Sequence, residues 1–534
     1  MSKMNKNILR FLGLTVVCLL IGIAFTRVGD NEAFPQDNIR ADLDRFVEVF
    51  AYVKRYYVEP VESDKLITGA IEGLLAKLDP HSVYIPKKSL EKVNEQFEGS
   101  FEGIGIEFIV LNKVLTVVSP IPGGPSEAVG LLPGDQIVRI DGVSAYGITE
   151  DEVFKKLRGP KGSRVKVTVA RANLADPFDV EIVRDKIPIN SLYAAFMLDD
   201  GKTGYIWLAR FAKTTADELE AALKDLHSQG MKRLILDLRS NAGGLLEQAV
   251  EVADKFIPAG QKLVYTRGRL TGADEDFFST SNGDQPMKPM IVMISHGSAS
   301  ASEIVAGAIQ DLDRGLVVGQ TSFGKGLVQN QIGLKDGSAL RLTVARYYTP
   351  SGRLIQRPYT GGLADYYAAA YDDEDANAPT AQPDSGRTVY KTRAGRTVFG
   401  GGGITPDSTL KAERITRFTN DLFGRRIFFE LGSKYGTALR GRYTSFAIFR
   451  AQFSIGEEFT ADLKEVLKKN KIEFNEEAYK RDEAFIKTMV KAEVARTLWD
   501  SKHYYQVLRS EDPEVIAAEA LMPQAASILK QGGW

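Results

Sequence analysis

Three serines alternate with alanine in the segment S-H-G-S-A-S-A-S-E-I-V-A-G-A at residues 295–308, with Ser300 in the middle. The segment follows an apolar run typical of a strand and leads into a helical pattern. A serine at such a turn can expose its hydroxyl, while the helix start supplies backbone N–H groups and a positive dipole end suited to a developing oxyanion. Serines also cap helices without doing chemistry, so this segment alone fits either role.

A nucleophilic serine needs a base, but the positions of the four histidines give a histidine base little support: His81, His227, His296 and His503. The segment T-S-F-G-K-G-L-V-Q at 321–329 offers Lys325 instead, with apolar neighbours that can desolvate its amine. Burial can lower a lysine pKa from about 10.4 by about 3–5 units, which provides a neutral amine at pH 7. Gln329 lies four residues on and can orient that amine. A plain surface turn is the alternative interpretation of G-K-G.

The segment L-I-L-D-L-R-S-N-A-G-G-L at 234–245 predicts a strand that ends in a polar, glycine-rich turn. Backbone N–H groups at Gly243 or Gly244 can complete an oxyanion hole there. A phosphate site is not indicated, because the sequence has neither G-x-G-x-x-G nor G-x-x-x-x-G-K-[ST].

Strands and helices alternate from residue 202 to 320, around the segments described above. This alternation predicts an α/β core in which catalytic groups lie where strands run into helices. We assign the core to residues 188–410, with an insertion at about 359–386 that carries six acidic residues and no Lys or Arg. That composition indicates a solvated segment without chemistry of its own.

The rest of the chain makes the predicted fold class multidomain α/β. Residues 30–97 have apolar positions three and four apart, which is typical of helices. Residues 98–187 consist of short β-type runs separated by Gly and Pro, which predicts a small, mostly β domain. Residues 411–534 predict a charged helical extension. Within it, 457–510 predicts an amphipathic helix that packs on the core or on another subunit, and an independent charged helical appendage is the alternative.

Residues 1–29 have the pattern of an export signal, in which a basic start precedes an apolar run at 11–25. About 15 residues is short for a membrane span, which needs about 20, and no A-x-A cleavage site follows. A cleaved signal and an uncleaved inner-membrane anchor both stay open. We expect a protein of the periplasm or cell envelope. The single cysteine, Cys18, lies in this run, so export brings no disulfide chemistry.

Composition argues against several classes of protein. Lys plus Arg is 68 and Asp plus Glu is 69, so the net charge is -1 and no nucleic-acid partner is implied. The sequence has four His and one Cys, without H-E-x-x-H or paired C-x-x-C. This scarcity of ligands argues against a metalloprotease or an iron–sulfur protein, and we expect neither a metal nor an organic cofactor.

The motifs L-D-P-H-S-x-Y, L-D-L-R-x-N-x-G-G, S-A-S-A-S-E and F-G-K-G-x-V-Q occur together in this order. In combination they resemble the carboxyl-terminal processing peptidases, also called tail-specific proteases, from about residue 38 to 410. The resemblance implies that Ser300 is the nucleophile, that Lys325 is the general base and that Gln329 orients the lysine.

The same resemblance implies an oxyanion hole formed by the amide of Ala301 and by one glycine of the G-G pair. We prefer Gly243 for this role, and Gly244 stays open. Some descriptions of the family add an aspartate, which would be Asp311. We interpret Asp311 as structural, because a carboxylate close to the lysine would raise the lysine pKa and oppose its function as a base.

The β domain at 98–187 resembles a PDZ domain. Its loop Gly103, Ile104, Gly105 and Ile106 takes the place of the loop whose N–H groups bind the terminal carboxylate of a peptide. The peptide would then add as an extra strand. A β module used only for packing within the chain is the alternative. The resemblance also makes Arg158, in L-R-G-P-K-G, a candidate connection between this domain and the protease core, and a plain surface turn is the alternative.

The sequence therefore predicts an exported serine endopeptidase that recognises protein C-termini and cleaves through a Ser-Lys acyl-enzyme mechanism. Its expected partners are protein or peptide C-termini as substrates and an adaptor protein, with a homo-oligomer formed through 411–534. The alternative from a different class is a catalytically silent PDZ scaffold or envelope chaperone.

Overall fold

The computed structural model describes residues 39–171, 174–280, 287–359, 365–367, 387–411, 414–456 and 458–534. The predicted export signal at 1–29 lies outside these residues, as does almost all of the acidic insertion. The chain divides into two compact units, Met1–Leu74 and Leu75–Trp534.

The first unit contains α2 (Ile39–Tyr56) and most of α3 (Ser63–Leu75), which confirms the predicted helical N-terminal region. The apolar spacing that predicted a helix falls on α2, and none of the α2 residues is buried. Among the residues that the structure describes, no helix combines the length and the apolar character needed to cross a membrane.

The predicted mostly β domain is confirmed. Its main sheet has the order β3-β4-β5-β7-β8, with β6 paired to β5, and β2 and β9 form a separate ribbon. The bounds are β2 (Ser100–Gly103), β3 (Ile106–Leu111), β4 (Val114–Pro120), β5 (Gln136–Ile140), β6 (Val143–Ser144), β7 (Arg164–Ala170), β8 (Phe178–Val183) and β9 (Asp185–Pro188). Two helices complete it, α5 (Pro125–Ala128) and α6 (Glu150–Leu157). A capping box between Thr149 and Glu152 begins α6, whose Val153 and Leu157 are buried.

The α/β core is built on a sheet of order β10-β11-β12-β15-β16-β21, parallel from β11 onward. Its strands are β10 (Leu192–Met197), β11 (Thr203–Leu208), β12 (Arg233–Asp237), β15 (Met290–Ile294), β16 (Leu316–Gly319) and β21 (Ser408–Thr409). Every residue of β15 and β16 is buried, as expected for parallel strands covered on both faces. One face packs against α7 (Thr215–Ser228), α8 (Leu246–Asp254) and α9 (Ala301–Asp311).

A second sheet contains the strand that follows the loop of Lys325, the predicted general base. In it β18 (Ala339–Tyr348) pairs with β1 (Val83–Ile85), β13 (Lys262–Gly268) and β17 (Leu327–Gly333), and β14 (Glu275–Phe278) pairs with β13. The smaller elements nearby are α4 (Lys87–Glu98), η1 (Thr271–Ala273), β19 (Val389–Lys391) and β20 (Thr397–Phe399).

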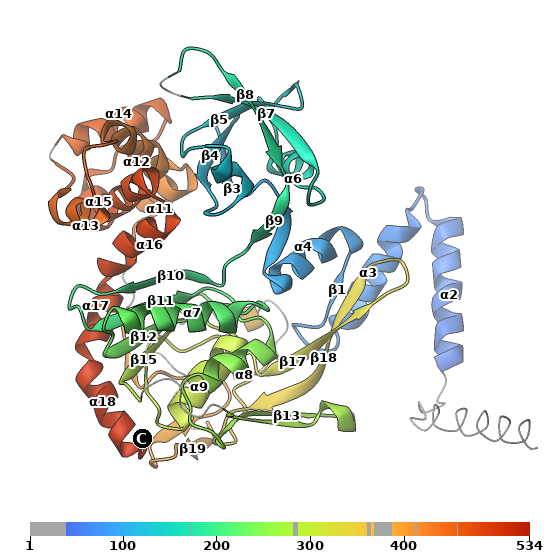
Figure 1. Ribbon diagram of the computed structural model, residues 1–534. Coiled ribbons are helices and arrows are strands. Elements are labelled where there is room, and N and C mark those ends of the chain that lie inside the picture. Colours follow the sequence, from blue (N-terminus) through green and yellow to red (C-terminus); the bar gives the residue numbers. More distant parts are fainter. Residues whose placement is uncertain are drawn as a thin grey trace, which may run out of the picture. The chain divides into compact units, whose positions relative to one another are not determined.

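The C-terminal extension is helical, as predicted, but its helices divide between two hydrophobic clusters. The first cluster is formed by α11 (Arg417–Gly424), α12 (Ile427–Ala438), α13 (Phe446–Gln452), α14 (Phe459–Lys469), α15 (Glu476–Leu498) and α16 (Ser501–Ser510). The last two helices, α17 (Pro513–Ala520) and α18 (Met522–Gln531), instead pack on the face of the core sheet opposite α7–α9. Figure 1 shows α17 and α18 running along the left side of that sheet.

The proposed boundary near residue 411 therefore separates two helices from the sheet that they cover. Val515, Ala518, Met522 and Ala525 share a cluster with sheet residues, among them Ile291. The sequence predicted a helical extension at 411–534, but it could not tell which surface each helix covers. A sheet with both faces apolar requires a second covering layer, and the end of this chain provides it.

We expect Ala525→Asp to destabilise the fold by about 3 kcal/mol or more, because it puts an unpaired carboxylate in a fully buried position on the core sheet. Chemical unfolding followed by circular dichroism measures the change. Ser527→Asp is the matched control, since Ser527 lies on the exposed side of the same helix. Equal stability of the two variants would show that α18 does not cover the sheet.

Candidate active site

Ser300 lies at the turn between β15 and α9, immediately before the first residue of the helix. Its φ is 55° and its ψ is -113°, which is strained for a residue other than glycine. The flanking serines are buried and engaged, because Ser298 Oγ donates to the Leu238 carbonyl and Ser302 Oγ donates to the Asn241 carbonyl, each at 2.8 Å. Only the middle serine of the three has a partly exposed side chain.

The glycine-rich turn after β12 lies directly against Ser300. A Cβ added to Gly243 would lie 2.9 Å from Ser300 Cβ and 2.9 Å from the Ala301 nitrogen. A Cβ added to Gly244 would instead lie 2.0 Å from the Phe211 carbonyl oxygen. The structure thus brings Gly243, Ser300 and Ala301 together, while Gly244 faces another strand end.

The Gly243 N–H is engaged within its own loop, since it donates to Asn241 Oδ1 at 2.9 Å. To serve a substrate oxyanion it must exchange that oxygen for the substrate oxygen. The role predicted for Gly243 stays a prediction, which its position beside Ser300 supports.

Lys325 and Gln329 contact each other as predicted from their spacing, because the Lys325 Nζ donates to Gln329 Oε1 at 2.9 Å. Gln329 Nε2 in turn donates to the His81 carbonyl. That carbonyl belongs to the turn D-P-H-S, in which Asp79 accepts hydrogen bonds from the His81 and Ser82 amides at 2.8 and 2.9 Å. The motif around His81 therefore fixes the glutamine through a main-chain oxygen.

Burial, followed by the positive charge of Arg341, lowers the pKa of Lys325 from 10.5 to about 8. Glu303 and Asp79 act in the opposite direction. A pKa near 8 leaves roughly a tenth of the amine neutral at pH 7. Lys325 thus has an amine that can accept a proton close to neutral pH.

The histidines are placed elsewhere. The His81 ring Nε2 contacts the Tyr366 hydroxyl at 2.8 Å, and burial, followed by the charge of Lys325, lowers its pKa to about 4. His227 lies in the last turn of α7, and His503 Nδ1 contacts Asp500 Oδ1 at 2.6 Å. His296 precedes Ser298 in the turn after β15.

Glu303 is a residue of the site that the sequence interpretation missed. Its fully buried carboxylate accepts hydrogen bonds from the amides of Ser300 at 2.8 Å and Lys325 at 2.9 Å, both at Oε2. Its other oxygen, Oε1, accepts from the Gly324 amide at 2.7 Å and from Ser322 Oγ at 2.5 Å. One carboxylate thus joins the serine turn to the lysine loop.

The local half of this arrangement has a sequence signature, because S-x-x-E at the start of a helix indicates a capping box. The other half joins residues about twenty positions apart, which spacing alone does not reveal. Burial raises the pKa of Glu303, and the hydrogen bonds from its donors oppose that rise.

Asp311 lies at the other end of α9, about 15 Å along the helix from Ser300. Its Oδ1 accepts a hydrogen bond from the buried guanidinium of Arg353 at 2.7 Å, and its Oδ2 accepts one from the Ser351 amide at 3.0 Å. This placement supports the interpretation of Asp311 as structural.

The loop predicted to bind a terminal carboxylate connects β2 to β3. Gly103 ends β2, Gly105 has a φ of 73°, and the Ile104 carbonyl accepts from Ser126 Oγ at 2.6 Å. The next strand, β3, is at the edge of its sheet, so it can accept an added strand. Ile106 is the first residue of β3.

Arg158 does connect the β domain to a neighbouring element, and that element is α4. Its Nη1 contacts Glu95 Oε2 at 2.5 Å, and its guanidinium lies 4.8 Å from the Phe154 ring centre. The Phe97 carbonyl near the end of α4 accepts a hydrogen bond from the Lys213 amide of the core at 2.9 Å. Arg158 thus reaches the core through α4.

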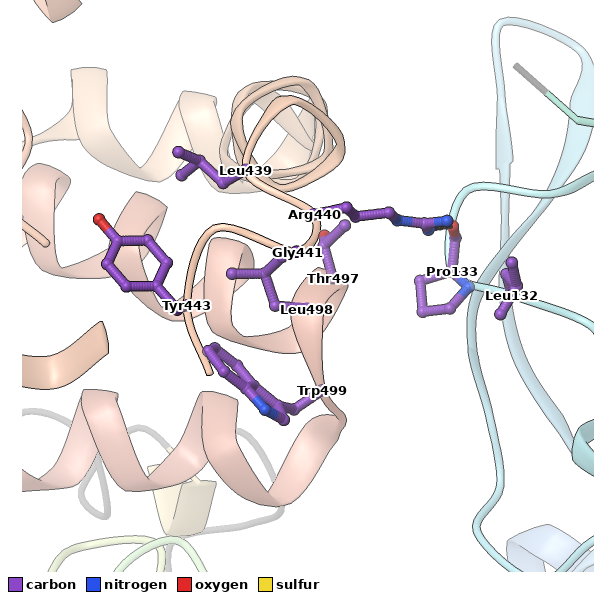
Figure 2. A pocket seen from close by; sticks show the side chains of 9 residues that line it. All are labelled: Leu132, Pro133, Leu439, Arg440, Gly441, Tyr443, Thr497, Leu498 and Trp499. Carbon is purple, nitrogen blue, oxygen red and sulfur yellow. Dashed lines mark hydrogen bonds between the residues drawn. The ribbon is translucent and has the colours of Figure 1, made fainter. Parts of the chain in front are cut away.

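A cavity of about 270 Å³ lies between the β domain and the C-terminal helices. Figure 2 shows Leu132 and Pro133 on one side and Tyr443 and Trp499 on the other. The Arg440 side chain crosses the space and donates to the Pro133 carbonyl at 3.3 Å. None of the candidate catalytic residues lines this cavity. In the part of the chain that the structure describes, no group of three or more His, Cys, Asp or Glu residues could hold a metal ion.

Four segments of the chain match known families. Residues 202–365 match peptidase family S41 and residues 116–171 match the PDZ domain. Residues 26–89 match the activating protease CtpB N-terminal domain, and residues 418–500 match a family of unknown function, DUF8443.

Similar proteins cover about two thirds of the chain. A carboxy-terminal-processing protease of Bartonella bacilliformis is 41% identical over 66% of this chain and 80% of its own length. The carboxy-terminal processing protease CtpA of Bacillus subtilis is 34% identical over 62% of this chain and 72% of its own. A solved structure named photosystem II D1 C-terminal processing protease is 28% identical, covers 71% of this chain and 95% of that one, and has a TM-score of 0.36.

We expect Arg341→Gln to raise the pKa of Lys325 above about 8, because it removes a positive charge that disfavours the ammonium. A ¹³C NMR titration of the lysine Cε resonances measures the shift. Arg346→Gln is the matched control, since Arg346 is an exposed residue of the same strand and is not among the charges that shift the Lys325 pKa. An unchanged pKa in Arg341→Gln would contradict the electrostatic account of this amine.

Proposed function

Because the chain belongs to the carboxy-terminal processing peptidases of family S41, which makes it a serine-type peptidase with a PDZ domain, we propose that Ser300 is its nucleophile and Lys325 its general base. The observation that carries this proposal is the Glu303 carboxylate, one oxygen of which accepts hydrogen bonds from the amides of both residues. A lysine whose pKa is lowered to about 8 supplies the neutral amine that the mechanism needs.

In the first half of the reaction, the neutral Lys325 amine takes the proton of Ser300 Oγ while that oxygen attacks the scissile carbonyl carbon. The negative charge that develops on the carbonyl oxygen is stabilised by the Ala301 amide and by the Gly243 amide, once it has left Asn241. The lysine ammonium then protonates the departing nitrogen, so that the C–N bond breaks and an acyl-enzyme remains.

In the second half, Lys325 is neutral again and takes a proton from water, whose oxygen attacks the ester carbon. The proton returns to Ser300 Oγ as the second product leaves, which restores the starting state. Gln329 orients the amine in both halves through its contact with Nζ. No step calls for a metal or an organic cofactor.

Substrate recognition is the second part of the proposal. The loop from Gly103 to Ile106 would bind the C-terminal carboxylate of a protein, and the tail would add as a strand along β3. The free edge of β3 supports this arrangement. We also propose that the chain is exported to the periplasm or cell envelope, on the basis of the sequence pattern at 1–29. An adaptor protein and a homo-oligomer formed through 411–534 stay predictions.

A catalytically silent PDZ scaffold, the alternative function, would bind tails without turnover. It gives no reason for a buried lysine of lowered pKa to be joined to a strained serine through one carboxylate.

We expect kcat/KM for peptide cleavage to rise about tenfold from pH 7 to a plateau above the Lys325 pKa, because only the neutral amine accepts a proton. Lys325→Arg stays charged over this range and should lose about 10²–10⁴-fold in rate. Ser300→Ala should abolish cleavage. His227→Gln is the control and should keep the wild-type profile. Steady-state assays across pH decide the matter, and normal turnover in Lys325→Arg would refute the dyad.

We expect amidation of a substrate's C-terminus to lower kcat/KM about 10- to 100-fold, because the charge-assisted hydrogen bonds to the terminal carboxylate are worth about 1.5–3 kcal/mol. Competition between free-acid and amidated forms of one peptide measures the ratio. A peptide with an internal side-chain carboxylate neutralised instead controls for net charge. Equal cleavage of the free-acid and amidated forms would contradict the proposal that this loop binds the C-terminal carboxylate.

A further inference from the structure

The start of α17 contacts the loop that carries the glycine-rich turn. Asp512 precedes the helix and accepts a hydrogen bond from Arg239 Nη2 at 2.8 Å. Glu514 lies in the first turn, and its Oε2 is 3.1 Å from Arg239 Nη1. Arg239 is 8% exposed, so both contacts are largely shielded from water. Two carboxylates from near the end of the chain thus bind one buried guanidinium of the core.

Arg239 is also held from inside the core. Asp237, the last residue of β12, accepts from Arg239 Nη2 at 2.6 Å and from its amide at 2.9 Å. The Tyr205 hydroxyl donates to the same carboxylate at 2.6 Å. Asp237 is fully buried. The single negative charge of Asp237 is shared among these donors. The carboxylates of Asp512 and Glu514 supply further negative charge to the guanidinium from the α17 side.

The loop after Arg239 leads directly to the candidate site. Ser240 has a φ of 58°, and its amide donates to Ser295 Oγ at 3.0 Å. The Asn241 carbonyl accepts from the Ala299 amide at 3.0 Å and from Ser302 Oγ at 2.8 Å. Gly243 then lies against Ser300. Arg239 is therefore joined through the main chain of this loop to the turn that faces Ser300.

Glu514 reaches the second loop of the site as well. Its Oε2 accepts a hydrogen bond from Gln320 Nε2 at 3.4 Å. Gln320 directly follows β16 and begins the segment that leads to Lys325, and its amide donates to the Ile294 carbonyl at the end of β15. The start of α17 therefore lies where the loops from β12 and β16 leave the sheet.

We propose that Asp512 and Glu514 are positioning residues for peptide cleavage, which hold Arg239 and through it the 238–245 loop in the geometry that stabilises the oxyanion. The inference rests on the proposed role of Ser300. It gives the last part of the extension a function in the reaction itself, in addition to covering the sheet.

The same helix carries a matched contact at the other end of β12. Glu519 of α17 lies 3.4 Å from Arg233, the first residue of that strand, and Arg233 also contacts Asp200 at 2.7 Å. This contact joins α17 to β12 as the Asp512 and Glu514 contacts do, but it lies a full strand length from the glycine-rich turn. Glu519→Gln therefore weakens the attachment of the helix without touching the loop.

The experiment compares Asp512→Asn, Glu514→Gln, their double variant and Glu519→Gln in the full chain. We expect kcat to fall about 10- to 100-fold in the double variant with KM nearly unchanged. The reason is that a small displacement of the oxyanion donors destabilises the transition state and not the bound substrate. The kcat of each single variant should lie between that of the double variant and that of the wild type. Glu519→Gln should keep the wild-type kcat.

The inhibition constant of a peptide aldehyde would stay unchanged if Asp512 and Glu514 had only a structural role. The aldehyde's tetrahedral adduct with Ser300 forms when Oγ adds to the carbonyl carbon and the neutral Lys325 amine takes the Oγ proton, so that the former carbonyl oxygen carries the negative charge at the oxyanion site. We expect its inhibition constant to rise about 10- to 100-fold in the double variant, while the affinity for the free-acid product peptide stays constant. Glu519→Gln should leave both values unchanged.

Unfolding midpoints and circular dichroism are measured for every variant, and kinetics are compared at a temperature where all are folded. If the double variant is unfolded at that temperature, the kinetics of the single variants test the inference. A wild-type kcat in Asp512→Asn and Glu514→Gln, or an equal loss in Glu519→Gln, would overturn the inference while Ser300-dependent cleavage by the wild type stands. Absence of Ser300-dependent cleavage in the wild type would refute the proposed function itself.

Discussion

The buried carboxylate of Glu303 is the interaction on which the arrangement of the site depends. It joins the turn before α9 to the loop before β17 through hydrogen bonds to the amides of Ser300 and Lys325. A carboxylate without water is costly unless donors surround it, and here main-chain N–H groups and the Ser322 hydroxyl do so. The strained backbone of Ser300 is held by the same network, so the main chains of Ser300 and Lys325 are both fixed by a single carboxylate.

The core sheet sets where these loops meet. Its parallel strands end at one edge, where the segments after β12, β15 and β16 carry Gly243, Ser300 and Lys325 respectively. Covering both faces of such a sheet requires two layers. The first is α7–α9, and the second comes from α17 and α18 at the far end of the chain. The helix that covers the second face also brings Asp512 and Glu514 to Arg239.

The electrostatics of the site follow from burial. Lys325 is desolvated and lies near Arg341, which together lower its pKa to about 8 despite the opposing charges of Glu303 and Asp79. The same desolvation and the lysine charge keep His81 neutral. His81 contributes its main-chain carbonyl, which fixes Gln329. His81 thus acts through its backbone, while Lys325 has an amine whose pKa is lowered toward neutral pH.

The sequence by itself determined the order of helical, mostly β, α/β and helical regions, because alternation, helical spacing and turn residues are local properties of the chain. It also predicted a hydrogen bond between Gln329 and the Lys325 amine, which the structure contains. Tertiary structure alone decided the remaining contacts. Glu303 meets the lysine loop, Gly243 and not Gly244 faces Ser300, and α17 reaches Arg239. These contacts join segments from about twenty to almost three hundred residues apart. They depend on which surfaces pack together, and no periodicity within a segment encodes that choice.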